Sequence, residues 1–198
     1  MFNSEAQISR SYDKQHLVPF GEYLPFQNFL EMIGLEQLTR IKGGFTAGSG
    51  PSLISLADIP SFRPLICYEA IFSGAINDGS HRPSWILNVT NDGWFGDTAG
   101  PHQHLHQARI RAVEEGLPLV RAANTGISAI IDPYGRILFQ LELNKEGVID
   151  GDLPVAAPPT IYSKIGVSIM FLFLLLGLLI PVFFVIRKED ILQNRSDP

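Results

Sequence analysis

The side chains most able to do chemistry are a cysteine, a lysine and two glutamates in two short segments. Cys67, the sole cysteine of the chain, ends an apolar run where a buried strand is expected to turn into a helix. Such a turn presents a nucleophile at a strand end. Lys14 and Glu22 lie upstream in residues 12–25, which prolines and a glycine constrain, and Glu69 follows the cysteine. A thiol, a cation and carboxylates together indicate acyl-transfer chemistry.

Each of these residues also has a purely structural interpretation. A catalytic thiol needs a nearby cation or base that favours the thiolate, and Lys14 is the candidate cation. A single cysteine after an apolar strand is nevertheless more often a small buried residue, and a single lysine is more often a solvated surface charge. Glu22 and Glu69 could each orient Lys14, take up a proton or lie in solvent. The residues alone leave these alternatives open.

The apolar pattern predicts an α/β layered sheet, whose strand ends and loops would carry function. Strands are expected at 52–57, 63–66, 85–89, 119–122, 128–131 and 137–141, with helices at 26–41, 69–76 and 102–116. Residues 132–135, Asp-Pro-Tyr-Gly, predict a turn between the last two strands.

The loop at 88–101 is expected to close over a pocket, because polar turn formers surround two aromatic residues directly after a strand. Trp94 and Phe95 could hold an acyl chain or form a local core. His102, His104 and His106 follow, but only the first and third share a helix face, and no cysteine or carboxylate accompanies them at ligand spacing. We therefore expect no metal site and no cofactor.

Charge and cysteine content narrow the function classes. The formal net charge is −5 and no long basic run occurs, which argues against nucleic acid as a partner. One cysteine excludes an internal disulfide framework.

The C-terminal region predicts a membrane anchor. Residues 165–186 carry no charge, and a helix of that length spans a bilayer. Arg187 and Lys188 follow this run, whereas one lysine precedes it, so the basic bias places residues 189–198 in the cytoplasm. We expect a domain at 1–160 outside the cytoplasm and a transmembrane helix at 161–188.

The N-terminus has neither the basic nor the apolar region of a signal peptide. An exported domain at 1–160 would then need earlier membrane helices. The expectation is that this chain is the C-terminal part of a longer protein.

Four sequence blocks in order resemble the nitrilase (carbon–nitrogen hydrolase) superfamily, and within it the membrane branch of bacterial apolipoprotein N-acyltransferases. The blocks begin at Tyr12 (YDKQHLVPFGEYLP), Ile66 (ICYE), Asn91 (NDGWFGDTAGPHQH) and Arg121 (RAANTGISAIIDPYGR). One hydrophobic helix follows them. The resemblance covers nearly the whole chain and implies a partial αββα sandwich on a periplasmic domain, held in the bacterial inner membrane.

The resemblance also implies site residues. Cys67 matches the nucleophile and Lys14 the lysine of a Glu-Lys-Cys triad. Glu22 matches a second glutamate important to the site. Tyr68 and Glu69 match the residues that follow the nucleophile, and Trp94 matches the aromatic residue of the loop over the pocket.

The implied reaction is ping-pong acyl transfer between two lipid substrates. The donor is a membrane phospholipid, the carrier is a thioester on Cys67, and the acceptor is the N-terminal diacylglyceryl-cysteine of an apolipoprotein. A membrane helix suits this chemistry, because the site must stay at the bilayer surface.

The chain departs from the family pattern. Nothing before Lys14 corresponds to the triad glutamate, since Glu5 is too close to Lys14 in sequence, and the first strands of the sandwich and the N-terminal membrane helices of the family have no counterpart in it. The 198-residue chain is therefore expected to be inactive alone. Two other interpretations remain. A nitrilase-type amidase would use the same cysteine, although its soluble members lack the terminal helix. A membrane-anchored remnant without activity would keep Cys67 as a core residue.

Overall fold

The elements follow a β–α–β order and then a β-meander. A computed structural model describes residues 1, 5–34, 44–50, 52–74, 76, 81–168, 171 and 173–181. Its elements are α1 (Gln27–Met32), β1 (Phe62–Ile66), the 3-10 helix η1 (Cys67–Ile71), β2 (Trp85–Asn91), the 3-10 helix η2 (Gly93–Phe95), α2 (Gly100–Glu115), β3 (Leu119–Asn124), β4 (Ser128–Ile131), β5 (Ile137–Leu141) and α3 (Ile161–Ile165).

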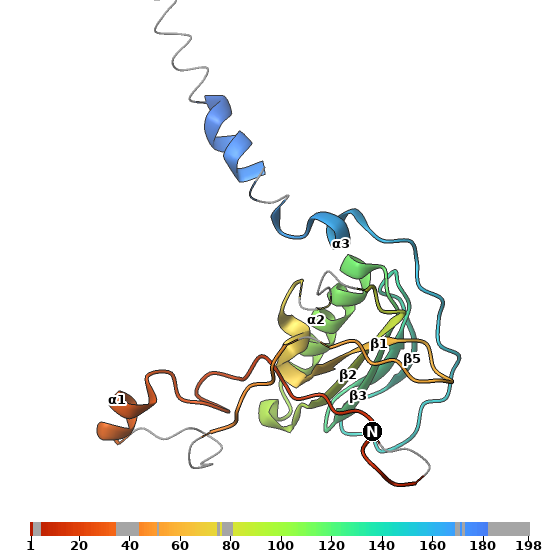
Figure 1. The fold of residues 1–198 in the computed structure, drawn as a ribbon, viewed down its shortest axis with the longest axis horizontal. Helices are drawn as coiled ribbons and strands as arrows, with labels where there is room; N and C mark the ends of the chain where they lie inside the picture. Colours follow the sequence, from red (N-terminus) through yellow and green to blue (C-terminus); the bar gives the residue numbers. More distant parts are fainter. Residues whose placement is uncertain are drawn as a thin grey trace, which may run out of the picture.

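The described strands form one five-stranded mixed sheet in the order β1-β2-β3-β4-β5 (Figure 1). The β1–β2 and β2–β3 pairs are parallel, and the β3–β4 and β4–β5 pairs are antiparallel. Parallel strands end at the same edge of a sheet, so η1 after β1 and η2 after β2 emerge side by side. This edge carries the candidate site.

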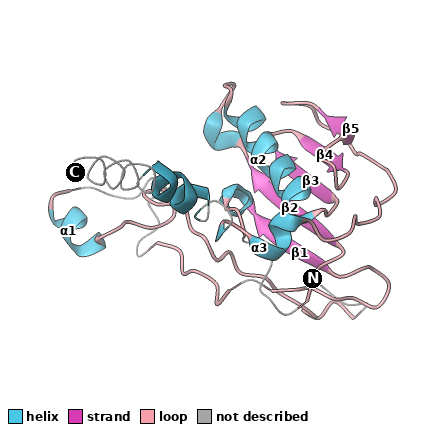
Figure 2. Ribbon diagram, turned by 90° about the horizontal axis from the view of Figure 1, so that it is seen from above, coloured by secondary structure: helices cyan, strands magenta, loops and turns pink. Residues whose placement is uncertain are grey.

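Helix α2 covers one face of the sheet (Figure 2). Its Leu105, Ala108 and Ala112 are buried at helical spacing, and they join Ile86 and Leu119 of the strands in the hydrophobic core. The two alanines let the helix backbone approach the sheet closely. Gly116 ends the helix in the left-handed conformation, with φ of 64°. The expected helix at 102–116 is confirmed with its start two residues earlier.

The last strands are as predicted. The strands expected at 63–66, 85–89, 119–122, 128–131 and 137–141 are all present. The turn between β4 and β5 is stabilised by Asp132, whose Oδ1 accepts hydrogen bonds from the backbone N–H groups of Tyr134 and Arg136 at 2.9 Å each. Gly135 takes a positive φ of 77° there.

Three predicted elements are corrected. The segment 52–57 is not a strand, because it meets β1 at one antiparallel bridge, Ile54 with Phe62, and then diverges. The helix expected at 26–41 is α1, which stops at Met32 because Gly34 adopts φ of 81°; residues 35–41 lie outside the described part. The helix expected at 69–76 is the 3-10 helix η1, and it begins at Cys67 itself.

Helix α1 extends away from the sheet (Figure 1), and none of its residues is buried. At the other end of the chain, a long extended segment returns along the sheet to α3, and residues 173–181 are helical. Of the predicted transmembrane helix at 161–188, residues 161–168, 171 and 173–181 are described, whereas the tail at 189–198 lies outside the described part. Within the described residues, no helix is long and apolar enough to cross a membrane.

The observed architecture is α/β, as the sequence predicted. One sheet layer and the helix layer of α2 are present in the described residues. The sandwich that would pair this sheet with a second one remains a prediction, as does the domain boundary at 160.

Candidate active site

Cys67 occupies a strained turn at the end of β1. It is the first residue of η1, and its φ of 51° is in the left-handed region, where a residue with a Cβ is disfavoured by roughly 1–2 kcal/mol. The side chain is half-buried. Strain of this kind persists only where the surroundings hold it, and it is concentrated at functional sites. The turn directs Cys67 out of the sheet edge.

Glu69 holds this turn to the N-terminal segment. Its carboxylate is 1% exposed and lies in the interior at the base of η1. Oε2 accepts from the backbone N–H of Ile66 at 2.7 Å, and Oε1 accepts from those of Gln15 and His16 at 2.7 and 3.2 Å. The Tyr12 hydroxyl donates to both oxygens at 2.9 and 3.0 Å. The sequence left the role of Glu69 open, and the structure makes it an anchor for residues 12–16.

Tyr12 keeps its proton in this arrangement. Burial raises the pKa of Tyr12 well above its ordinary value, and the adjacent Glu69 charge raises it further. The hydroxyl therefore remains a hydrogen-bond donor at any pH at which the protein works.

Lys14 is paired with Glu22. The ammonium nitrogen lies 2.7 Å from each carboxylate oxygen of Glu22, and the backbone N–H of Val18 donates to Oε2 at 2.8 Å. The two side chains are 10% and 24% exposed, so the pair is shielded from most solvent screening. Of the two carboxylates considered from the sequence, Glu22 is the one that orients Lys14.

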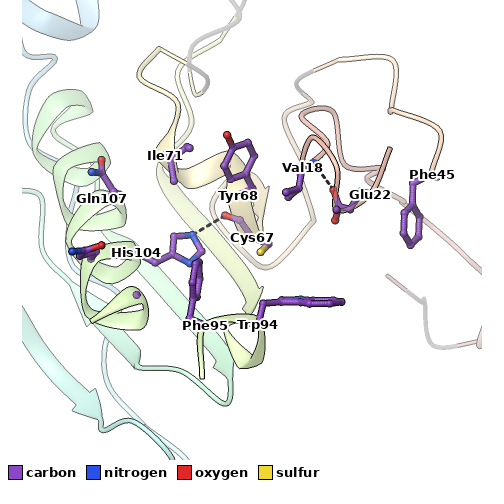
Figure 3. A pocket seen from close by; sticks show the side chains of 13 residues that line it. Val18, Glu22, Phe45, Cys67, Tyr68, Ile71, Trp94, Phe95, His104 and Gln107 are labelled. Carbon is purple, nitrogen blue, oxygen red and sulfur yellow. Dashed lines mark hydrogen bonds between the residues drawn. The ribbon is translucent and has the colours of Figure 1, made fainter. Parts of the chain in front are cut away.

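Cys67 and Glu22 line a single cavity of about 480 Å³. Figure 3 shows the cysteine between two walls: α2 with His104 and Gln107 on one side, and the N-terminal segment with Val18 and Glu22 on the other. The complete lining is Val18, Gly21, Glu22, Phe45, Cys67, Tyr68, Ile71, Trp94, Phe95, Gly100, Gln103, His104 and Gln107. Mostly apolar walls around a few polar groups are typical of a ligand pocket.

The aromatic residues expected at the pocket are there. Trp94 and Phe95 come from η2 and are 62% and 42% exposed, so they are not a buried local core. Tyr68 lines the cavity beside Cys67 and contacts Phe72 edge to face, with 5.1 Å between ring centroids. Gly100 is required at the start of α2, because a Cβ there would lie 2.7 Å from the Phe95 ring.

The carbon-nitrogen hydrolase family matches residues 1–157 of this sequence. The chain belongs to the carbon–nitrogen hydrolase family. Within it, the chain is 55% identical over 166 residues to an apolipoprotein N-acyltransferase of Bradyrhizobium diazoefficiens and 57% identical over 162 residues to one of Rhodopseudomonas palustris. These matches cover 84% and 82% of this chain but 31% and 30% of the relatives. The chain thus spans about a third of the length of these curated relatives.

Solved structures of the same superfamily are more distant. An amidase of the nitrilase superfamily from Nesterenkonia is 21% identical, with a TM-score of 0.48 over 72% of this chain and 50% of the amidase. A CN-hydrolase superfamily protein of Xanthomonas campestris is 16% identical, with a TM-score of 0.46 over 68% of this chain and 49% of that protein.

The sequence missed one buried residue of this carbon–nitrogen hydrolase site. His104 was considered only as a metal ligand, yet it is 5% exposed and its Nε2 lies 3.1 Å from the Cys67 carbonyl oxygen. The spacing of the sequence could have predicted that His104 is buried, because His104 falls on the same helix face as Leu105, Ala108 and Ala112. His102 and His106 are exposed.

Proposed function

We propose that the native polypeptide carrying this chain is an apolipoprotein N-acyltransferase. The observation that carries the proposal is a cysteine held at φ of 51° on the wall of an apolar cavity, with Glu22, the ion-pair partner of Lys14, on the opposite wall. The names of the relatives agree with it. Lys14, Glu22 and Cys67 are the proposed catalytic residues.

The first half-reaction starts from the Cys67 thiolate, whose proton has passed to a carboxylate base. Sγ attacks the carbonyl carbon of a phospholipid ester, and the π electrons move onto the carbonyl oxygen. When they return, the bond to the glycerol oxygen breaks. That oxygen takes the proton back, so lysophospholipid leaves and the acyl chain stays as a thioester. The Lys14 ammonium offsets the charge on the carbonyl oxygen in the transition state.

The second half-reaction forms an amide. The neutral α-amino group of the diacylglyceryl-cysteine attacks the thioester carbon, the carbon–sulfur bond breaks and the amine gives up one proton to the base. Cys67 leaves as the thiolate with which the cycle began. The products are a triacylated lipoprotein and free enzyme.

Other wall residues hold the substrates in this scheme. Trp94 and Phe95 are placed to contact the acyl chain, because their exposed rings border the cavity. Tyr68 supports the acyl carbonyl end beside Cys67. Glu69 acts on the site through the segment that bears Lys14, since its oxygens accept hydrogen bonds from the two residues that follow the lysine.

The proposal extends to architecture and location. Residues 1–160 would form the C-terminal part of an αββα carbon–nitrogen hydrolase domain on the periplasmic side of the bacterial inner membrane. Residues 161–188 would cross the bilayer, and residues 189–198 would lie in the cytoplasm. An antibody raised against residues 1–160 tests this organisation: a native species far above 21.9 kDa supports an upstream part, whereas one at 21.9 kDa refutes it.

The reaction is tested by trapping the intermediate. The native polypeptide is purified in detergent, incubated with a phospholipid of one defined acyl chain, and examined by intact mass spectrometry. We expect an adduct of one acyl chain that maps to Cys67, that hydroxylamine removes, and that a diacylglyceryl-cysteine peptide discharges. Cys67→Ala should form none.

Two results would overturn the assignment. Rapid hydrolysis of small amides without any phospholipid adduct would favour the amidase. A Cys67 thiol that neither acylates nor reacts with iodoacetamide until the protein unfolds would favour the remnant without activity.

A further inference from the structure

A buried polar network lies beneath the nucleophile. His104 on α2 contacts the Cys67 carbonyl oxygen through Nε2 at 3.1 Å and Asp92 Oδ1 through Nδ1 at 2.8 Å. Arg121 on β3 donates to Asp92 Oδ2 at 2.6 Å. The network therefore links the end of β2, the middle of β3 and one helix to the backbone of the turn that carries Cys67.

Each ring nitrogen of His104 has a defined partner. The Cys67 carbonyl oxygen can only accept, so Nε2 carries a hydrogen. Asp92 is a carboxylate: burial alone would raise its pKa, but the His104 hydrogen bond and the Arg121 charge hold it below the ordinary value. Nδ1 therefore faces a carboxylate oxygen, and the guanidinium Nη2 of Arg121 lies 3.3 Å from the same nitrogen. Both ring nitrogens are thus held by buried polar partners.

The surroundings leave this network little freedom. His104 is 5% exposed, and Asp92 and Arg121 are 0% and 2% exposed. A Cβ at Gly126 would lie 2.6 Å from Asp92 Oδ2, so only glycine permits this approach. Thr90 Oγ1 donates to Asp92 Oδ1 at 3.0 Å. The carboxylate thus accepts three side-chain hydrogen bonds and is fixed in place.

We propose that His104 is a positioning residue for the nucleophile: held by Asp92 and Arg121, it fixes the Cys67 carbonyl and so keeps Cys67 in the left-handed conformation that directs Sγ into the cavity. The inference deepens the proposed function, since it concerns the same thiol. The hydrogen bond stabilises a left-handed backbone conformation that is disfavoured for a residue with a Cβ.

A simpler interpretation is that His104 fills space in the core. Its ring does contact Phe95 edge to face, with 5.9 Å between centroids. Packing alone, however, does not require a donor at Nε2 or a carboxylate behind Nδ1. The two interpretations differ in what a substitution that keeps the donor should do.

The test compares two substitutions of His104 whose amide side chains differ in length. His104→Gln places an amide nitrogen near the position of Nε2 and keeps a donor for the Cys67 carbonyl. His104→Asn reaches only the position of Nδ1 and loses that donor. His106→Gln is the matched control on the exposed face of α2. Each is made in the native polypeptide, and the rate constant for iodoacetamide alkylation of Cys67 is measured across pH.

We expect H104N to slow alkylation at its high-pH plateau by roughly 10- to 100-fold, as for a reacting atom displaced by about 1 Å. H104Q and H106Q should stay within about fivefold of the wild type. In single-turnover acylation from phospholipid, H104N should lower the maximal rate and leave the half-saturating concentration within about twofold.

Equal loss in H104N and H104Q, or no loss in either, overturns the proposal. If H104N does not fold, Asp92→Asn replaces it, because loss of the Nδ1 partner should misplace the ring and slow alkylation similarly, with Asp97→Asn as the exposed control. Alkylation requires no lipid. A wild type that alkylates as expected but never acylates therefore refutes the proposed function and not this inference.

Discussion

Glu69 Oε1 accepts a hydrogen bond from the backbone N–H of Gln15 at 2.7 Å, across 54 residues of sequence. One buried carboxylate thereby joins the turn that carries Cys67 to the segment that carries Lys14. The contact holds Lys14 close to that turn in the fold, because Gln15 directly follows the lysine. The relationship gives the first prediction.

Glu69→Gln should loosen the N-terminal segment. The amide presents an NH₂ group where backbone N–H donors now meet an oxygen, so at least one donor is left unsatisfied at a cost of about 1–3 kcal/mol. We expect a lower free energy of unfolding and faster proteolysis within residues 12–22, together with slower acylation. Chemical denaturation and limited proteolysis measure this. Exposed Glu146→Gln is the control, and identical digestion of both variants would contradict the role of Glu69.

Lys14→Met should slow thioester formation on Cys67 by roughly 10²- to 10⁴-fold, the range for loss of a positioned charged group. Stopped reactions analysed by intact mass give the rate. Lys145→Met, an exposed lysine on the loop after β5, should match the wild type. Because Lys14 and Glu22 form one pair, the double variant with Glu22→Gln should be little worse than the worse single variant. Additive losses would mean that the two act separately.

The Trp94→Ala variant should bind donors with long acyl chains less well, and donors with short chains about as well as the wild type. An aromatic wall that contacts the chain contributes on the order of 1.5–3 kcal/mol of apolar burial, so the half-saturating concentration of a long-chain donor should rise by about tenfold or more. A short-chain donor should be affected little. Tyr134→Ala, an equally exposed aromatic residue on the β4–β5 turn, is the control. Equal effects on long-chain and short-chain donors would show that Trp94 does not contact the acyl chain.

Glu115→Gln should stabilise the fold at neutral pH. Burial at the end of α2 raises the pKa of Glu115 above its ordinary value of 4.5, and Glu114 raises it further, whereas Arg82 and Arg111 lower it in part. A raised carboxyl pKa means that the folded state binds the proton more tightly, so stability is lost as pH rises through that pKa. The melting temperature of E115Q should exceed that of the wild type at pH 7 and match it near pH 4.

The control for that comparison is Glu146→Gln, which is exposed. It should follow the wild type at both pH values. A wild type that gains stability between pH 4 and pH 7 relative to E115Q would reverse the sign and contradict the prediction.

The local pattern of apolar residues in the sequence predicted most strands of the sheet. β2 and β3 were predictable because each begins with consecutive apolar residues, and α2 because its apolar spacing ends at Gly116. The segment 52–57 carried a similar pattern and failed, because a strand needs a partner and only Ile54 finds one. Helix α1 ends at Met32, where Gly34 takes a positive φ, although the apolar pattern continues beyond that glycine.

In the candidate site, too, some features could be predicted from the sequence and others depended on the fold. The sequence by itself determined the reactive groups: one thiol, a lysine and a glutamate in a constrained segment, and two aromatic residues after a strand. Only the tertiary structure decided that Glu22 pairs with Lys14, that Glu69 anchors the backbone, and that His104 meets the Cys67 carbonyl. The physical reason is that hydrogen bonds between segments far apart in sequence depend on how the strand ends and α2 come together, and no local spacing encodes that arrangement.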